Sequence, residues 1–257
     1  MKHIPRKRFG QNFLNSQGVI NDILNAICPR PDDALVEIGP GLAALTAPLL
    51  QIVRHLHVVE IDRDLIARLR QQFSSAALTI HEGDALEFDF SALGNDLRIV
   101  GNLPYNISTP LLFHLAQYAG LVRDMHFMLQ KEVVDRMVAG PGGREFGRLS
   151  VMLQYRFHVE SLFIVPPDAF TPAPKVDSAI VRLIPKTAVE MAPCDPDLLA
   201  QVVTTAFSQR RKMLRNTLRD LMPAGALEAL NIDPTVRAEE LEIADFVRIA
   251  NTLAQKE

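Results

Sequence analysis

The chain has 257 residues, of which 48% are hydrophobic, and a formal net charge of −3 at pH 7. This length and hydrophobic content predict one large globular domain, alone or with a small annex. The two cysteines, Cys28 and Cys194, are too few for a disulfide framework and match no metal-ligand spacing, so we expect free thiols and no bound metal. The N-terminus lacks an apolar signal core, and no apolar run is long enough to span a bilayer. We therefore expect a cytoplasmic protein that does not enter membranes.

From about Leu35 to Leu129, short apolar runs alternate with amphipathic stretches of helical length. The apolar runs predict strands at Ala34–Ile38, His55–Ile61, Leu78–Glu82, Leu97–Gly101 and Met125–Leu129. The stretches between them predict helices such as Asp62–Phe73 and Ser108–Tyr118, the second of which is capped by Ser108 or Thr109. Strands that alternate with helices predict a parallel sheet with helices on both faces.

The pattern changes after Arg144. A helix is expected at Gly147–Phe157, and two strands are expected at Val159–Val165 and Ser178–Ile184, joined by a proline-rich loop without a helix. Such a pair of strands is expected to lie antiparallel at one edge of the sheet.

The last third of the chain is predicted to be helical. Prolines at positions 185, 193 and 196 precede helices at Leu198–Met222 and, shorter, around Ala226–Leu230 and Asp245–Ala254. We therefore predict an α/β sheet domain over residues 1–186 and a small all-helical domain over residues 187–257.

A glycine turn follows the first predicted strand. Glycines at this position let the backbone approach a ligand closely, and the N-terminus of the next helix offers free N–H donors. Gly39, Gly41 and Ala44 fit the dinucleotide-binding spacing, which tolerates alanine in the third place. The turn alone does not separate NAD from other ligands that contain adenosine.

Carboxylates end the next two predicted strands. Glu60 lies about twenty residues after the turn, where an acid can accept hydrogen bonds from ribose hydroxyls. Asp84 ends the third strand and could accept a hydrogen from the adenine amino group, although such a residue is also a common helix cap. Because parallel strands end at one edge of a sheet, the turn and both acids predict a single crevice for an adenosine ligand.

The fourth strand is followed by Asn102-Leu103-Pro104-Tyr105, beside the same crevice. The amino group of adenine is a poor nucleophile because its lone pair is delocalised into the ring. The Asn102 amide oxygen and a backbone carbonyl at Leu103 or Pro104 could hold both amino hydrogens and free that lone pair, with proline fixing the carbonyl. Tyr105 offers a ring on which the base can stack. The alternative is an ordinary Asn/Pro turn with a packed tyrosine.

Basic residues form two clusters on this acidic protein. An N-terminal arm contains Lys2, Arg6, Lys7 and Arg8, and a second cluster contains Arg210, Arg211, Lys212, Arg215 and Arg219. On the predicted helix, residues 211, 215 and 219 would share one face, so the second cluster is predicted to contact phosphates. A solvated helix face is the alternative.

The chain resembles the ribosomal RNA adenine N6-dimethyltransferases from Arg8 to about Arg219, and especially their bacterial small-subunit members. The matching motifs, in chain order, are Gly10–Leu14, Glu37–Gly41, Val59–Asp62, Gly83–Ala85, Asn102–Tyr105, Phe127–Val133, Phe170–Ser178 and Phe207–Lys212. One departure is Ala43, where the family usually has a third glycine. The resemblance implies a Rossmann-like methyltransferase sheet, mostly parallel with an antiparallel edge pair.

The resemblance also implies S-adenosyl-L-methionine as the cofactor. Its contact positions are Asn12, Leu14, Gly39, Glu60, Asp84 and Asn102, to which the glycine turn adds Gly41. Phe170 is interpreted as a second aromatic side of the base pocket, with a core phenylalanine as the alternative. The implied substrate is 16S rRNA in the small ribosomal subunit, methylated on two adjacent adenines near its 3′ end by a monomeric enzyme.

Three other functions remain open from the sequence. A dimethyltransferase acting on 23S rRNA would share the chemistry, but the motifs at Phe170–Ser178 and Phe207–Lys212 favour the small-subunit enzyme. A non-catalytic assembly factor of the small subunit would not need the intact Asn102 and Tyr105. An NAD oxidoreductase would have no use for the Asn-Leu-Pro-Tyr segment.

Overall fold

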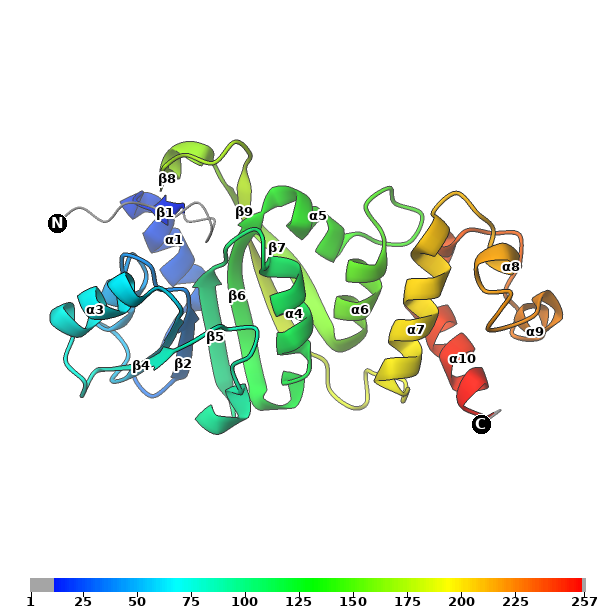
Figure 1. Ribbon diagram of the computed structural model, residues 1–257, viewed down its shortest axis with the longest axis horizontal. Coiled ribbons are helices and arrows are strands. Elements are labelled where there is room, and N and C mark those ends of the chain that lie inside the picture. Colours follow the sequence, from blue (N-terminus) through cyan, green and yellow to red (C-terminus); the bar gives the residue numbers. More distant parts are fainter. Residues whose placement is uncertain (1–11, 256–257) are drawn as a thin grey trace. The chain divides into compact units, whose positions relative to one another are not determined.

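Figure 1 shows the computed structural model, which describes residues 12–255. The basic N-terminal arm, with Lys2, Arg6, Lys7 and Arg8, lies outside the described residues. Contacts divide the chain into two compact units, the first formed by Met1–Val134 with His158–Pro185 and the second by Asp135–Phe157 with Lys186–Glu257. The segment Asp135–Phe157 thus groups with the C-terminal helices, whereas the sequence analysis placed it within the domain 1–186.

A seven-stranded sheet forms the centre of the first unit, in the order β4-β3-β2-β5-β6-β9-β7. Its strands are β2 (Ala34–Ile38), β3 (Leu56–Glu60), β4 (Leu78–Glu82), β5 (Leu97–Asn102), β6 (Val122–Gln130), β7 (Phe157–Val165) and β9 (Ser178–Pro185). The first five of these pair in parallel, and β9 pairs antiparallel with β6. The predicted mostly parallel sheet with the two late strands at one edge is therefore confirmed.

The α-helices of this unit connect the strands. They are α1 (Gln17–Ile27), α2 (Thr46–Leu49), α3 (Arg63–Gln72), α4 (Ser108–Ala116) and the start of α5 (Lys131–Val138), with 3-10 turns η2 (Phe90–Leu93), η3 (Ala119–Leu121) and η4 (Pro167–Ala169). Val100 and Met128 pack in one hydrophobic core with Ile20 and Ile23 of α1. Their strand neighbours Ile99 and Phe127 point to the opposite face and are also fully buried, so both faces of the sheet are covered.

Two details differ from the sequence prediction in this unit. The N-cap position of α4 is Ile107, and no side chain caps the helix; Ser108 is already its first residue, and its hydroxyl donates to the carbonyl of Tyr105. A two-stranded ribbon, β1 (Phe13–Leu14) antiparallel to β8 (Phe170–Thr171), was not predicted because each strand is too short to show alternation.

The second unit consists of helices. It contains α6 (Arg148–Arg156), α7 (Pro196–Ala206), η5 (Phe207–Gln209), α8 (Leu214–Thr217), α9 (Ala224–Ala229), η6 (Ala238–Glu240) and α10 (Ile243–Ala254). Its hydrophobic core joins Val151 and Tyr155 of α6 to Leu199 and Val203 of α7 and Phe246 of α10.

The prediction of one continuous helix over Leu198–Met222 is wrong. Helix α7 ends at Ala206, and α8 has only four residues. The reason is a non-local backbone pairing, in which the amide of Leu214 donates to Val236 O at 2.9 Å and that of Arg215 donates to Pro234 O at 3.0 Å. These amides are therefore not available for the i→i−4 bonds of a continuous helix.

Candidate active site

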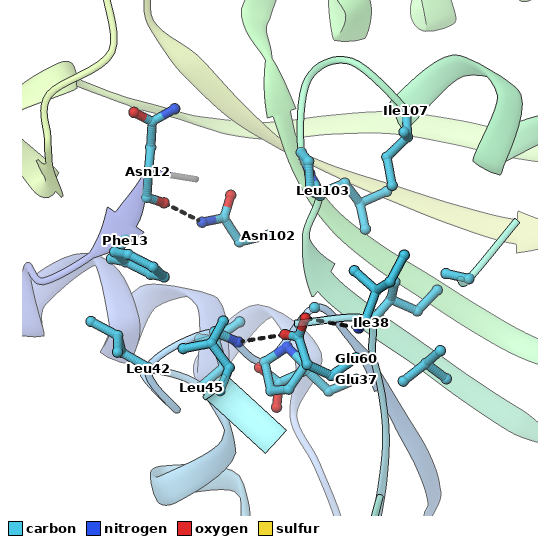
Figure 2. A pocket seen from close by; sticks show the side chains of 18 of the residues that line it. Asn12, Phe13, Glu37, Ile38, Leu42, Leu45, Glu60, Asn102, Leu103 and Ile107 are labelled. Atoms are coloured by element: carbon cyan, nitrogen blue, oxygen red, sulfur yellow. Dashed lines mark hydrogen bonds between the residues drawn. The ribbon is translucent and has the colours of Figure 1, made fainter. Parts of the chain in front are cut away.

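A cavity of about 290 Å³ opens where β2, β3, β4 and β5 end. Asn12 and the two residues of β1, which begin the described part of the chain, also line it. Figure 2 shows its lining side chains. The following predicted site residues line it: Asn12, Leu14, Gly39, Gly41, Glu60, Asp84, Asn102, Leu103, Pro104 and Tyr105. Apart from Phe170, every predicted catalytic or cofactor-binding residue is thus at one cavity, as expected for the C-terminal edge of a parallel sheet.

The glycine turn after β2 has left-handed backbone at both glycines, with φ of 67° at Gly39 and 57° at Gly41. A Cβ at residue 41 would lie 3.3 Å from the ring of Phe13, so glycine keeps the turn close to β1. Ala43 also has a positive φ, 67°, a left-handed conformation that glycine adopts with less strain than alanine.

Glu60 is fixed by backbone amides at the edge of the cavity. Its Oε1 accepts hydrogen bonds from the amides of Ile61 and Asp62, each at 2.9 Å, and its Oε2 accepts from Gly41 at 3.4 Å. Burial raises the pKa of Glu60, and the backbone hydrogen bonds oppose this shift. Asp84 accepts from the amide of Leu86 at 2.9 Å and so also caps the turn that follows it.

Glu37 is a second buried acid in the cavity, and sequence reasoning did not select it. Its Oε2 accepts a 2.6 Å hydrogen bond from the hydroxyl of Thr46, and the side chain is 2% exposed. Burial, opposed by this hydrogen bond and reinforced by the Glu60 carboxylate, raises the pKa of Glu37 to about 7. The two acids lie together in Figure 2 because Glu37 pairs with Val58, two residues before Glu60 on the same strand face.

The segment after β5 is tied to its surroundings at both ends. The Asn102 side-chain amide donates from Nδ2 to the backbone oxygen of Asn12 at 3.0 Å, as Figure 2 shows. One hydrogen of the amide group is thereby used, which fixes the orientation of the side chain, and Oδ1 can act as an acceptor for another partner. The amide of Leu103 donates to Met128 O at 3.1 Å, and the Tyr105 hydroxyl is 2.8 Å from Ser178 Oγ. This arrangement gives a fixed set of acceptors next to a half-buried aromatic ring.

The structure does not support Phe170 as a second aromatic side of the base pocket. Its ring is 3% exposed, packs in the hydrophobic core with Leu14 and Val165, and is absent from the residues that line the cavity. In the β1–β8 ribbon residue 170 pairs with Leu14, and the Phe170 ring packs into the hydrophobic core beside it. Phe170 is the core phenylalanine of the alternative interpretation.

The basic cluster lies on the second unit, and all five of its side chains are exposed. Arg210 is held by Glu239, with a Nε–Oε2 distance of 2.8 Å, and by the carbonyl of Arg144. Arg219 pairs with Asp220 at 3.3 Å. Because residues 207–213 leave the helix, residues 211, 215 and 219 do not share the single helix face that the sequence predicted. Arg211, Lys212 and Arg215 have no ion-pair partner within 4.0 Å among residues 12–255.

The residues of the cavity fit a nucleoside cofactor with a charged tail. The cavity is mostly apolar, as an adenine site requires, and Glu60 and Asp84 supply acceptors for ribose hydroxyls and for an amino group. Glu37 adds a carboxyl that can become negative opposite a cationic group. Together with the sheet order, these features define a Rossmann-like methyltransferase.

Comparison with known proteins agrees with this class. The sequence profile of ribosomal RNA adenine dimethylases matches residues 2–255. A protein of Dechloromonas aromatica named "Ribosomal RNA small subunit methyltransferase A" is 62% identical over 98% of this chain and 99% of its own length. A protein of Thiobacillus denitrificans with the same name is 61% identical over 99% of this chain and 100% of its own.

Solved structures show the same fold. A dimethyladenosine transferase from Plasmodium falciparum superposes with a TM-score of 0.81 and 26% identity over 95% of this chain and 98% of its own. The 23S rRNA methyltransferase ErmE superposes with a TM-score of 0.73 and 24% identity over 95% of this chain and 100% of its own, which shows the fold alone.

The chain therefore belongs to the ribosomal RNA adenine dimethylase family. It is an enzyme that uses S-adenosylmethionine, and the NAD oxidoreductase and non-catalytic hypotheses are set aside. Within residues 12–255 no helix is long and apolar enough to cross a membrane.

We expect the affinity for S-adenosylmethionine to rise between pH 6 and pH 8. With a pKa of about 7, Glu37 is mostly protonated at pH 6, and a cationic ligand favours its ionised form. The dissociation constant measured by titration calorimetry should therefore fall by up to about tenfold over this range.

Two comparisons control this measurement. Glu37→Gln, which is neutral at every pH, should remove most of the pH dependence. S-adenosylhomocysteine lacks the sulfonium charge and should show a weaker dependence on the wild-type protein. An equally steep dependence in the variant would assign it to another group.

Proposed function

We propose that the enzyme transfers methyl groups from S-adenosylmethionine to N6 of two adjacent adenines near the 3′ end of 16S rRNA, giving N6,N6-dimethyladenosine during small-subunit biogenesis. The relatives named as small-subunit methyltransferases, which cover nearly the whole chain, support this substrate. We further propose that it acts as a monomer in the cytoplasm. The observation on which the catalytic part depends is the fixed Asn102 amide, which lines the cavity together with Tyr105.

The residues of the cavity suit the cofactor as follows. The backbone of Gly39 and Gly41 lets it approach the turn, Glu60 accepts from its ribose, and Asp84 accepts from its adenine. Asn12 and Leu14 of the first segment complete this side of the cavity. When bound, the cofactor would supply an electrophilic methyl group on a sulfonium sulfur, and loss of that methyl group would leave neutral S-adenosylhomocysteine.

The target adenine is activated by the segment after β5. In the first transfer, Asn102 Oδ1 accepts one hydrogen of the exocyclic amine and the carbonyl of Leu103 or Pro104 accepts the other. In the second transfer the monomethylated amine has one hydrogen left, and one of these acceptors holds it. Hydrogen bonds from the amine to these acceptors favour a tetrahedral nitrogen with a free lone pair. The acceptors are already in place before the reaction, so they need no reorganisation. Tyr105 stacks on the base, which stabilises it by about 1–3 kcal/mol. The methylated nitrogen then releases one proton to solvent, so no strong base is required.

One assay tests the substrate. The protein is incubated with labelled S-adenosylmethionine and small subunits from a strain that lacks the modification, and the rRNA is digested to nucleosides. We expect label in N6,N6-dimethyladenosine from 16S rRNA. Label on 23S rRNA when large subunits are offered instead would support the related large-subunit enzyme.

We propose that the C-terminal helical segment, residues 187–257, binds rRNA through Arg210, Arg211, Lys212, Arg215 and Arg219. Arg211, Lys212 and Arg215 are the cations in this cluster best placed to meet phosphates, because they are exposed and, unlike Arg210 and Arg219, have no ion-pair partner within 4.0 Å among residues 12–255. Arg210 also bonds Glu239 and the carbonyl of Arg144, so it holds the turn in addition to adding charge. The N-terminal arm is a second proposed contact.

Charge reversal at this cluster should weaken subunit binding. Arg211→Glu together with Arg215→Glu is expected to lower the affinity for small subunits by about tenfold or more, and to reduce the salt slope of binding by about 2. Filter binding over a range of salt concentrations measures both quantities.

The matched control is Arg30→Glu with Arg68→Glu, two exposed arginines of the first unit. That double variant should bind subunits as the wild type does. Cofactor affinity should be unchanged in both double variants, and its loss in the first would contradict a role limited to RNA binding.

A further inference from the structure

The phenol of Tyr105 has a partner from a distant part of the chain. Its hydroxyl lies 2.8 Å from Oγ of Ser178, the first residue of β9, and that serine is 0% exposed. Ser178 ends the motif Phe170–Ser178, and the sequence predicts no role for it. The contact joins the segment after β5 to the end of the proline-rich loop.

The sheet register explains why these two residues meet. Asn102 at the end of β5 pairs with Met128 of β6, and Ser178 pairs with Gln130 on the other side of β6. Two backbone bonds fix both segments to the same strand end, from the amide of Leu103 to Met128 O at 3.1 Å and from the amide of Lys131 to the carbonyl of Asp177 at 2.9 Å. The contact between the Tyr105 and Ser178 hydroxyls therefore crosses the end of β6. It joins two segments that backbone hydrogen bonds already fix to that strand.

The contact also determines which part of Tyr105 is available for chemistry. Since the hydroxyl is paired with Ser178, the ring face is the part left to a substrate. Burial raises the pKa of this phenol and the Ser178 hydroxyl opposes the shift, so the group stays neutral at physiological pH. A neutral and engaged hydroxyl is unsuited to act as a base, which agrees with stacking as its task.

We propose that Ser178 is a positioning residue that holds the Tyr105 ring in the orientation in which it stacks on the target adenine. This inference rests on the proposed stacking role of Tyr105. A side chain fixed at its backbone and at its hydroxyl does not lose rotational freedom when the base binds, so the reacting amine is presented in one orientation. The β9 strand thus contributes to the base site without touching the base.

The test compares Ser178→Ala, Tyr105→Phe, the double variant and Tyr105→Ala, with Tyr118→Phe as the matched control for loss of a tyrosine hydroxyl elsewhere. Ser178→Ala and Tyr105→Phe each remove one of the two hydroxyls, and each should lower kcat by about three- to tenfold. This is the effect expected for the loss of one buried hydrogen bond. The affinity for S-adenosylmethionine, measured by calorimetry, should not change. The double variant should be no slower than either single variant, because both remove the same contact.

A spectroscopic measurement separates positioning from general damage to the fold. The chain has three tyrosines, so 3-fluorotyrosine labelling gives a simple fluorine NMR spectrum in which Tyr105→Phe identifies the signal of residue 105. Ser178→Ala should shift and broaden that signal and leave the other two unchanged. An unchanged signal with unchanged kcat, or multiplicative losses in the double variant, would overturn the proposal.

Tyr105→Ala distinguishes this inference from the function on which it rests. If Tyr105→Ala loses transfer while Ser178→Ala retains the full rate, stacking stands and the positioning role is refuted. If Tyr105→Ala itself retains full transfer, the stacking role fails and the positioning role fails with it.

Discussion

Replacement of Asn102 by alanine is expected to lower kcat for methyl transfer by about 10²–10³-fold, the usual loss when one preorganised hydrogen-bonding group is removed from an active site. The reason is that Oδ1 is the side-chain acceptor for the target amine, whereas the cofactor has several other contacts in the cavity. Affinity for S-adenosylmethionine should therefore weaken only slightly. Single-turnover assays with small subunits, together with calorimetry, measure the two effects separately.

Two further variants sharpen this experiment. Asn102→Asp keeps acceptor oxygens but places a carboxylate against the carbonyl of Asn12, which now accepts from Nδ2 at 3.0 Å, and it should fail as the alanine variant does. Asn21→Ala, on the exposed side of α1, is the matched control and should be fully active. Full activity of Asn102→Ala would refute the acceptor mechanism.

The second large effect concerns stability rather than chemistry. Gly101 lies in β5 against β2, where a Cβ would come within 2.5 Å of the carbonyl oxygen of Ile38 and 3.1 Å of Leu103 Cδ2. The nearest obstacle is backbone in a parallel sheet, which cannot move without breaking the pairing of the two strands. Gly101→Ala is therefore expected to cost about 3 kcal/mol of folding free energy.

Thermal unfolding followed by calorimetry measures this cost, with an expected decrease in midpoint of roughly 5–10 °C. Gly120→Ala is the matched control, because a Cβ there meets no atom within 4 Å. It should change the midpoint very little. An unperturbed midpoint in Gly101→Ala would show that the two strands separate more easily than their pairing indicates.

The parallel strands were predictable because each is a short run with apolar residues between helices, and β2, β3 and β5 are almost entirely buried. Ala34–Ile38 and Leu78–Glu82 match the predicted bounds, and β5 is longer by one residue at Asn102. The break after Ala206 was not predictable from local pattern. Leu214 and Leu218 have helical spacing, but the pairing with residues 234–237 is a long-range interaction that competes successfully with the helix.

The position of the site followed from topology, since residues that end neighbouring parallel strands meet at one edge. The contacts of individual side chains could not be predicted from topology in the same way. Glu37 was read only as part of a glycine motif, yet its place two residues before Gly39 on a buried strand could have identified it as a buried acid. The role predicted for Phe170 is wrong because nothing in the sequence indicates the two-residue strand that places it in the core.

The second unit, which consists of helices, is discontinuous in the chain, because α6 precedes β7 and β9 whereas α7 and α10 follow them. During translation α6 leaves the ribosome before the helices against which Val151 and Tyr155 pack have been made. Its apolar side is therefore exposed to solvent, or covered by a chaperone, until the C-terminal third is synthesised. A fragment that stops at residue 186 would keep that side exposed permanently, so expression of the sheet domain alone should give an aggregating product.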